Sequence, residues 1–259
     1  MISKIKEKSM RLVCRFNFTR KIGISLVKKN PELVKMDEID MAVDVASFVN
    51  HIKDIGFSQT FQLPERAKES LINYAKKASY KGQYSNKIFN IDYENPKKPH
   101  TDLWYLDKDI YVNCDTAKQL AHNTELVEIA KKYLGKEPKI KSTHSWWSFP
   151  QDKESYVHNY GYHYDIDSYK FVKFFIYLTD VDLDCGPHVI ISNTHKKKSI
   201  YEKINRKLSE EQVGKMFKKD QINVMTGKAG EGFFEDTFAY HKGTAPKKPR
   251  LIFQVEYSI

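Results

Sequence analysis

The chain has 259 residues, of which 41% are hydrophobic and 29% are charged, and this composition predicts a folded globular protein with one large domain or two small ones. It contains no apolar run of about 18 residues, which excludes a transmembrane helix. The formal net charge is +10, but ten basic and two acidic residues place +8 of it within residues 1–35, so the rest of the chain is nearly neutral.

A basic leader segment is predicted for residues 1–36. Hydrophobic residues are interspersed among its lysines and arginines, so it either contacts an anionic membrane or another polyanion peripherally, or forms an ordinary solvated first strand or helix. Arg15, Arg20 and Lys21 interrupt its apolar stretches, which argues against a secretory signal. The three cysteines of the chain have no CxxC spacing, which indicates a reduced, cytoplasmic protein.

Helices are predicted in the part that follows the leader, residues 37–138. Apolar spacing indicates one helix within 37–57, and Pro64 opens a second that runs to about residue 79. A third helix is expected at 125–134, because Asn123 is a good N-cap.

The second half, residues 139–259, has the pattern of a β-rich core. Strands are predicted at 169–181, 189–191, 233–241 and 250–257, with a turn at 182–187 and a short helix at 210–218 that Ser209 and Gln212 cap. Helices followed by many antiparallel strands predict a mainly β fold with helical buttresses (α+β) around a jelly-roll core. We therefore expect residues 37–259 to form a single domain.

Two histidines and one aspartate have the spacing of a metal site. Residues i and i+2 of a strand point to the same side, so His163 and Asp165 can reach one ion from a single strand. His241, at the end of another predicted strand, supplies a second imidazole. Two histidines and one carboxylate on one face of the ion are what a mononuclear, non-haem iron(II) centre requires.

Arg250 comes nine residues after His241, across a loop rich in Gly and Pro. A hairpin between the two predicted strands would bring Arg250 back beside His241. The planar guanidinium binds a carboxylate through two parallel hydrogen bonds, so Arg250 is the candidate for the distal carboxylate of 2-oxoglutarate. The residues thus indicate an oxygenase that uses iron(II) and 2-oxoglutarate.

Four stretches of the chain resemble the phytanoyl-CoA dioxygenase-like family of iron(II)/2-oxoglutarate oxygenases. They are residues 162–165, residues 171–182 with 186–188, residues 192–196, and Asp236 and Thr237 with 241–244 and Arg250. Together they span about the segment 139–257, and the first 138 residues match much less.

This resemblance implies a double-stranded β-helix and a site made of His163, Asp165 and His241. In such enzymes 2-oxoglutarate occupies two coordination positions of the iron, and O2 as co-substrate takes the last. Thr244 is similar to a serine or threonine that lies near the cofactor in relatives. Halogenating relatives lack the carboxylate, so the presence of Asp165 favours hydroxylation.

Lys173 lies within an otherwise apolar predicted strand. An inward-facing lysine is costly unless it is paired, so it either binds a carboxylate of the cofactor or the substrate, or points to solvent.

Aromatic residues cluster before and within the His163 motif, where they either stack on the substrate or pack the barrel. They are Trp146, Trp147, Tyr156, Tyr160, Tyr162 and Tyr164.

Strand alternation puts Trp146 and Ser148 on one face and Trp147 on the other, so only one set can face the pocket. The remaining histidines are expected to be structural, because none has a partner at strand spacing, and His188 and His195 resemble family positions that support the site or the fold instead of binding metal. His158 with His163 is a rival pair whose members would face opposite sides.

The leading hypothesis is a dioxygenase that hydroxylates a C–H bond of a small or medium polar molecule. Candidates are a sugar or glycolipid headgroup, an amino-acid derivative, a phosphonate or an acyl thioester. The alternatives are a non-enzymatic jelly-roll binding protein and an oxygenase that acts on nucleic acid. No nucleic-acid partner is expected, because the near-neutral core carries no recognition motif.

Overall fold

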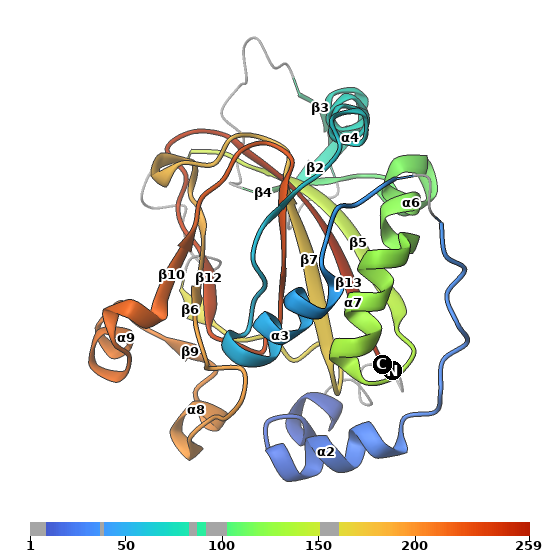
Figure 1. Cartoon of the computed structure of the whole chain (residues 1–259). Helices are drawn as coiled ribbons and strands as arrows, with labels where there is room; N and C mark the ends of the chain where they lie inside the picture. The colour runs from blue at the N-terminus through green and yellow to red at the C-terminus, as the bar shows by residue number, and fades with distance from the viewer. Residues whose placement is uncertain (1–8, 37–38, 83–86, 92–102, 151–160) are drawn as a thin grey trace.

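The computed structural model describes residues 9–36, 39–82, 87–91, 103–150 and 161–259. Two antiparallel sheets face each other, with helices outside the larger one (Figure 1). The large sheet has the order β1-β11-β7-β13-β5-β4-β2-β3 and the small sheet the order β10-β8-β12-β6-β9. This arrangement is a jelly-roll core with helical buttresses, as the sequence predicts.

The strands of the two sheets are short except for those at the centre of the large sheet. In the large sheet they are β1 Phe61–Gln62, β2 Ser79–Gly82, β3 Ile88–Asn90, β4 Leu103–Leu106, β5 Lys139–Ser148, β7 Phe171–Tyr177, β11 Glu231–Glu235 and β13 Arg250–Ser258. In the small sheet they are β6 Tyr162–His163, β8 His188–Ile191, β9 Lys207–Leu208, β10 Ile222–Met225 and β12 His241–Gly243.

Within the described residues the structure has helices at the four predicted places (37–57, 64–79, 125–134 and 210–218), and further helices that were not predicted. They are α2 Asn17–Leu26, α3 Val45–Ile55, α4 Glu65–Lys77, α5 Ile110–Asn113, α6 Asp115–His122, α7 Thr124–Leu134, α8 Ile200–Ile204 and α9 Glu210–Met216. The Asn123 side chain accepts a hydrogen bond from the Leu126 N–H (3.1 Å), which confirms the predicted cap of α7. Ser209 and Gln212 form the predicted capping box of α9.

The main hydrophobic core lies between the large sheet and the helices α3, α6 and α7 that cover its outer face (Figure 1). Strand β7 shows how alternation divides the strand between two environments. Val172, Phe174 and Ile176 pack into the helix-covered core, whereas Phe175 and Tyr177 belong to a second cluster between the sheets. Lys173 shares the inner side with Phe175 and Tyr177.

The predicted hairpin between His241 and Arg250 is wrong. Strand β11 ends at Glu235, and His241 begins β12 in the small sheet, whereas β13 pairs with β5 and β7 in the large sheet. The Asp236 side chain breaks the strand, because its Oδ1 accepts a hydrogen bond from the Phe238 N–H (2.9 Å) in a tight turn. The loop after β12 therefore crosses from one sheet to the other.

The described part of the leader forms helical turns at 9–13 and helix α2, which pack against the jelly roll. Cys14 is fully buried, and the Arg20 Nε donates to the Tyr169 carbonyl oxygen at 2.6 Å. The Lys136 Nζ donates to the carbonyl oxygens of Ile24 and Val27 at 2.6 and 2.9 Å. Within the described ranges, no helix has the length and apolar character needed to cross a bilayer.

Candidate metal centre

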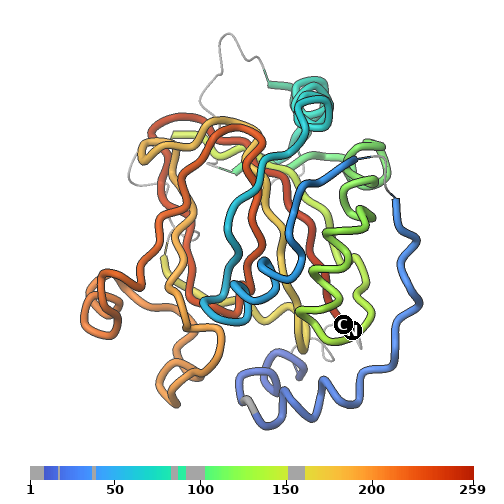
Figure 2. The backbone as a smooth tube through the Cα atoms, in the orientation of Figure 1, coloured from blue at the N-terminus to red at the C-terminus, as the bar shows by residue number. Residues whose placement is uncertain are grey.

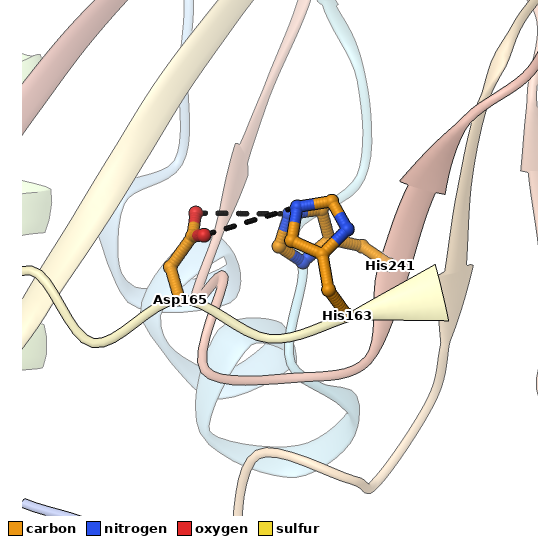
Figure 3. Close-up of side chains that lie close together, drawn as sticks. All are labelled: His163, Asp165 and His241. Atoms are coloured by element: carbon orange, nitrogen blue, oxygen red, sulfur yellow. Dashed lines mark ion pairs between the residues drawn. The ribbon is translucent and has the colours of Figure 1, made fainter. Parts of the chain in front are cut away.

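His163, Asp165 and His241 come together at the inner side of the small sheet (Figure 3). His163 and His241 are directly paired across β6 and β12, and their ring centroids are 4.4 Å apart. Strand β6 ends at His163, and the Asp165 N–H donates to the Thr237 carbonyl oxygen at 2.8 Å. The three side chains offer ligand atoms that all lie within 4.8 Å of one another.

Both imidazoles are oriented by their own backbone. The Nδ1 of His163 lies 2.9 Å from the Gly161 carbonyl oxygen, and the Nδ1 of His241 lies 3.0 Å from that of Ala239. A carbonyl oxygen only accepts, so each Nδ1 carries a hydrogen, and in the neutral ring the lone pair is then on Nε2. The arrangement leaves both Nε2 atoms as ligands.

The spacing of the ligand atoms suits a divalent ion. Asp165 lies 3.9 Å from the Nε2 of His163 through Oδ1, and 3.6 Å from the Nε2 of His241 through Oδ2. These distances are too long for hydrogen bonds. Ligands that are each about 2.1 Å from a shared ion stand about 3–4 Å apart, so the three residues fit a metal.

The protonation states also suit metal binding. Burial lowers the pKa of His241 to about 4, with a further contribution from His163, so its imidazole is neutral near pH 7. Burial alone would raise the pKa of Asp165, but Lys173 and the two histidines hold it well below the usual range. A neutral imidazole and an ionised carboxylate are the forms that ligate metals.

Lys173 is engaged with carboxylates at the edge of this site. Its Nζ lies 2.7 Å from the Asp165 Oδ2 and 2.9 Å from the Asp167 Oδ2, and the residue is 8% exposed. Burial opposes the charge, but Asp165 and Asp167 raise the pKa of Lys173 above its usual value. The solvent-facing alternative for Lys173 is therefore wrong.

Behind the metal-facing atoms lies a buried carboxyl group that sequence reasoning missed. Glu235 has no exposed surface, and its Oε2 lies 2.7 Å from the Nε2 of His188 while its Oε1 lies 3.8 Å from the Nδ1 of His241. Burial raises the pKa of Glu235 to about 7. The sequence feature that could have identified Glu235 is its position directly after Phe233 and Phe234, where a charged side chain is unusual in a predicted apolar strand.

Arg250 is 4% exposed at the start of β13 and lines the same cavity as the triad. Its Nη1 donates to the Gly186 carbonyl oxygen, and its Nη2 lies 3.4 Å from the Ser148 Oγ. The Thr244 hydroxyl donates to the Pro187 carbonyl oxygen at 2.8 Å. Gly186 has φ +69°, and a Cβ there would overlap the Thr244 carbonyl oxygen, so Arg250 and Thr244 both hold a turn that requires glycine.

A cavity of about 170 Å³ between the two sheets is lined by the triad, Lys173 and Arg250, whereas Thr244 and Glu235 are not among its lining residues. It is lined by Leu103, Tyr105, Trp146, His163, Asp165, Lys173, Phe175, Tyr177, His188, Phe233, Thr237, His241, Gly243, Arg250, Ile252 and Gln254. A second hollow of about 450 Å³ shares Tyr105 with the first. The Tyr105 ring stacks on Trp146, with centroids 5.8 Å apart and planes at 29°.

The remaining aromatic and histidine residues considered from the sequence lie in different parts of the structure. Trp146 faces the cavity and Trp147 packs into the core, so alternation assigns the two faces correctly. His188, expected to support the site or the fold, lines the cavity, whereas His195 lies under Gly56 with its Nε2 3.2 Å from the Lys53 carbonyl oxygen. His158, Tyr156 and Tyr160 lie outside the described residues.

No protein-family model matches the sequence, and no curated protein does. Solved structures do match. SnoN, a non-haem, 2-oxoglutarate-dependent epimerase of nogalamycin biosynthesis, has a TM-score of 0.57 and 13% identity over 82% of this chain and 82% of its own. HygX of Streptomyces hygroscopicus, with nickel and 2-oxoglutarate bound, has a TM-score of 0.58 and 13% identity over 84% and 87%. EvdO2 of Micromonospora carbonacea var. aurantiaca has a TM-score of 0.55 and 11% identity over 86% and 93%.

Sequence identities of 11–13% show that the chain has the same fold as these proteins, but they do not show that it catalyses the same reaction. SnoN has also been solved with Fe3+, 2-oxoglutarate and nogalamycin RO, and HygX with hygromycin B. The chain therefore has a jelly-roll fold that it shares with 2-oxoglutarate-dependent enzymes such as SnoN.

Proposed function

We propose that the protein is an iron(II)- and 2-oxoglutarate-dependent oxygenase of the phytanoyl-CoA dioxygenase-like type, which hydroxylates a C–H bond of a polar small molecule. The observation that carries the proposal is the shared cavity, in which two histidines and one carboxylate face one point and Arg250 lines the same space. The fold shared with SnoN and HygX supports it, since those proteins have been solved with 2-oxoglutarate and a metal.

The metal triad, Arg250 and Thr244 each have a role in this proposal. His163, Asp165 and His241 would hold the iron, which together with 2-oxoglutarate and O2 supplies the oxidising chemistry when bound. Arg250 would bind the distal carboxylate of 2-oxoglutarate through its planar fork. Thr244 secures the Gly186 turn against which Arg250 rests, and its hydroxyl is the second candidate contact for that carboxylate.

We assign Lys173 to Asp165 instead of to the cofactor. Its ammonium is already shared between two carboxylates, and the contact with the Asp165 Oδ2 leaves Oδ1 for the metal. A metal ligand is oriented by such hydrogen-bonded partners. Glu235 supports the other side of the site, because it lies against His188 and within 3.8 Å of the His241 Nδ1.

Hydroxylation and epimerisation differ in the product. SnoN is described as an epimerase, so this fold serves more than one outcome. We propose hydroxylation because the resemblance to the phytanoyl-CoA dioxygenase-like family covers all three proposed iron ligands, including the carboxylate of Asp165 that halogenating relatives lack. Mass spectrometry separates the two outcomes, since hydroxylation adds one oxygen atom to the substrate and epimerisation leaves its mass unchanged.

Among the polar candidates, the cavity favours a sugar or glycolipid headgroup. The stacked rings of Tyr105 and Trp146 form a flat aromatic surface that suits the apolar face of a sugar ring. The adjoining hollow is lined by charges of both signs and by hydroxyl groups, a mixture that suits a substrate with many hydroxyls. Its polar side chains include Lys81, Asp107, Lys108, Asp109, Lys141, Ser142, Thr143 and Ser145.

The function is tested by anaerobic titration of the protein with iron(II) and 2-oxoglutarate, followed by a succinate assay in air. We expect the visible charge-transfer band of an iron–2-oxoglutarate chelate. Absence of both the band and iron binding would leave a non-enzymatic jelly-roll binding protein.

Replacing Arg250 by alanine is expected to weaken 2-oxoglutarate binding at least about 30-fold, because truncating one partner of a buried charge pair costs about 2–5 kcal/mol. Titration of the same band with 2-oxoglutarate measures the affinity. Arg250→Lys keeps the charge but loses the fork, and we expect an intermediate affinity. Unchanged affinity in Arg250→Ala would remove Arg250 from the cofactor site.

Replacing Tyr105 by alanine is expected to raise KM for the substrate about tenfold, because the ring contributes stacking that is equal in the ground and transition states. The substrate itself is sought by succinate release across panels of sugars and glycosides, amino-acid derivatives, phosphonates and acyl thioesters. The control is Tyr111→Ala, since Tyr111 lies on α5 and bonds to His122 outside both hollows. Equal effects of the two variants on KM would argue against the aromatic subsite.

A further inference from the structure

Helix α2 exposes apolar side chains along one face. Phe18 and Leu26 are 75% and 76% exposed, and Ile22 between them is 44% exposed. Residues four apart lie on one side of a helix, so the three form a continuous stripe. Leu12 and Phe16, just before the helix, are 59% and 46% exposed and extend the apolar surface.

The orientation of this stripe is fixed by the opposite side of the helix. The Arg20 guanidinium lies 4.0 Å from the Phe238 ring centroid, and its Nε bonds to the Tyr169 carbonyl oxygen. Gly23 lies against the Tyr169 ring so closely that a Cβ would overlap it. Helix α2 therefore cannot rotate to bury the stripe without losing these contacts.

Helix α8 adds a second set of exposed apolar residues near the first. Ile200 and Ile204, again four apart, are 73% and 65% exposed. The Lys203 Nζ lies 5.7 Å from the Phe16 ring centroid, so the helix adjoins the start of α2. Figures 1 and 2 show both helices at the same end of the molecule. We call Leu12, Phe16, Phe18, Ile22, Leu26, Ile200 and Ile204 the α2–α8 apolar face.

Positive charge accompanies this face. Residues 9–31 contain no Asp or Glu, and Lys21, Lys28 and Lys29 are exposed along or just beyond α2. Lys197, just before α8, is also exposed, whereas Glu202 within α8 is buried in its capping box. An apolar strip bordered by lysines is typical of helices that lie in the interface of anionic membranes.

We propose that the α2–α8 apolar face docks the protein on a membrane surface that contains anionic lipids. Helix α2 has ten residues, about half the length needed to span a bilayer, so the contact is peripheral and in the plane of the interface. A second copy of the chain is the poorer occupant, because pairing this face with itself would bring the flanking lysines of both copies together. The docking is independent of the proposed reaction.

Cosedimentation of the full-length protein with vesicles tests the proposal. We expect binding to vesicles of phosphatidylcholine with phosphatidylglycerol, little binding to pure phosphatidylcholine, and weaker binding as salt rises. The double variant Phe18→Ser/Leu26→Ser should lower the vesicle partition coefficient about tenfold or more. Lys28→Glu/Lys29→Glu should lower binding to the anionic vesicles alone.

Leu183→Ser is the matched control, because Leu183 is 74% exposed on a different surface turn. It should bind vesicles like the wild type. Equal binding of the Phe18→Ser/Leu26→Ser protein, or no binding of the wild type to anionic vesicles, overturns the proposal. If the wild type fails to bind and is a dimer that the double variant converts to a monomer, the face is a contact between copies. Iron–cofactor titration of each variant separates these outcomes from a failure of the proposed reaction.

Discussion

Replacing His241 by alanine is expected to abolish iron(II) binding and turnover while the jelly roll remains folded. In the proposed function His163, Asp165 and His241 would hold the ion, and the His241 Nε2 on β12 lies 3.6 Å from the Asp165 Oδ2. Its Nδ1 is fixed by the Ala239 carbonyl oxygen, so the ring presents its Nε2 to the site, and the alanine variant loses that ligand atom. Isothermal titration with iron(II) under anaerobic conditions measures the loss.

The matched control is His51→Ala, because His51 lies on the exposed side of α3. That variant should bind iron(II) with the affinity of the wild type, and circular dichroism should show native spectra for both variants. Asp165→Ala should behave like His241→Ala. Retained iron binding and full succinate formation in the Asp165→Ala protein would contradict the assignment of the triad.

Local signals in the sequence were enough to predict several elements. Asn123 and the Ser209 capping box predict the starts of α7 and α9, because a cap is decided by residues three positions apart. The spacing of His163 and Asp165 indicates that both side chains reach one point, but Asp165 lies beyond the end of β6 and is held by the Thr237 carbonyl oxygen instead of by the predicted strand. His241 could be predicted from its neighbours in the sequence, because it follows an apolar stretch and precedes a loop rich in Gly and Pro. The prediction did not require knowledge of the strand with which it pairs.

Features that depend on distant parts of the chain were missed. The hairpin prediction assumed that neighbouring strands pair, whereas His241 and Arg250 belong to different sheets and meet across the cavity. Glu235 looked like one more residue of an apolar strand. Its role depends on His188, which comes from another strand almost fifty residues earlier, and no local pattern encodes that contact.

Replacing Lys173 by methionine is expected to destabilise the metal-free protein by about 2–3 kcal/mol, because it leaves two partly buried carboxylates without their cation. Lys173 pairs with Asp165 and Asp167 and faces Glu256 across β7 and β13. Urea denaturation of the metal-free protein measures the loss. The control is Lys228→Met, which breaks a surface pair with Asp180 and should cost no more than about 1 kcal/mol. Similar stability losses in the two variants would argue against a buried charge network.

The Lys173→Met variant also tests whether a bound metal ion can replace Lys173 as the positive charge beside the Asp165 carboxylate. A divalent ion bound by the triad brings positive charge to the carboxylate that Lys173 otherwise neutralises, so the ion should compensate part of the missing ammonium. Nickel(II) or iron(II) is therefore expected to raise the free energy of unfolding more in Lys173→Met than in the wild type, provided the variant still binds the ion. In Asp165→Asn/Lys173→Met the stability loss of the single Lys173→Met change should be partly recovered, because both charges of the pair are gone. A double variant no more stable than Lys173→Met would mean that Lys173 acts mainly through Asp167 and that Asp165 is held in place by its backbone contact to Thr237.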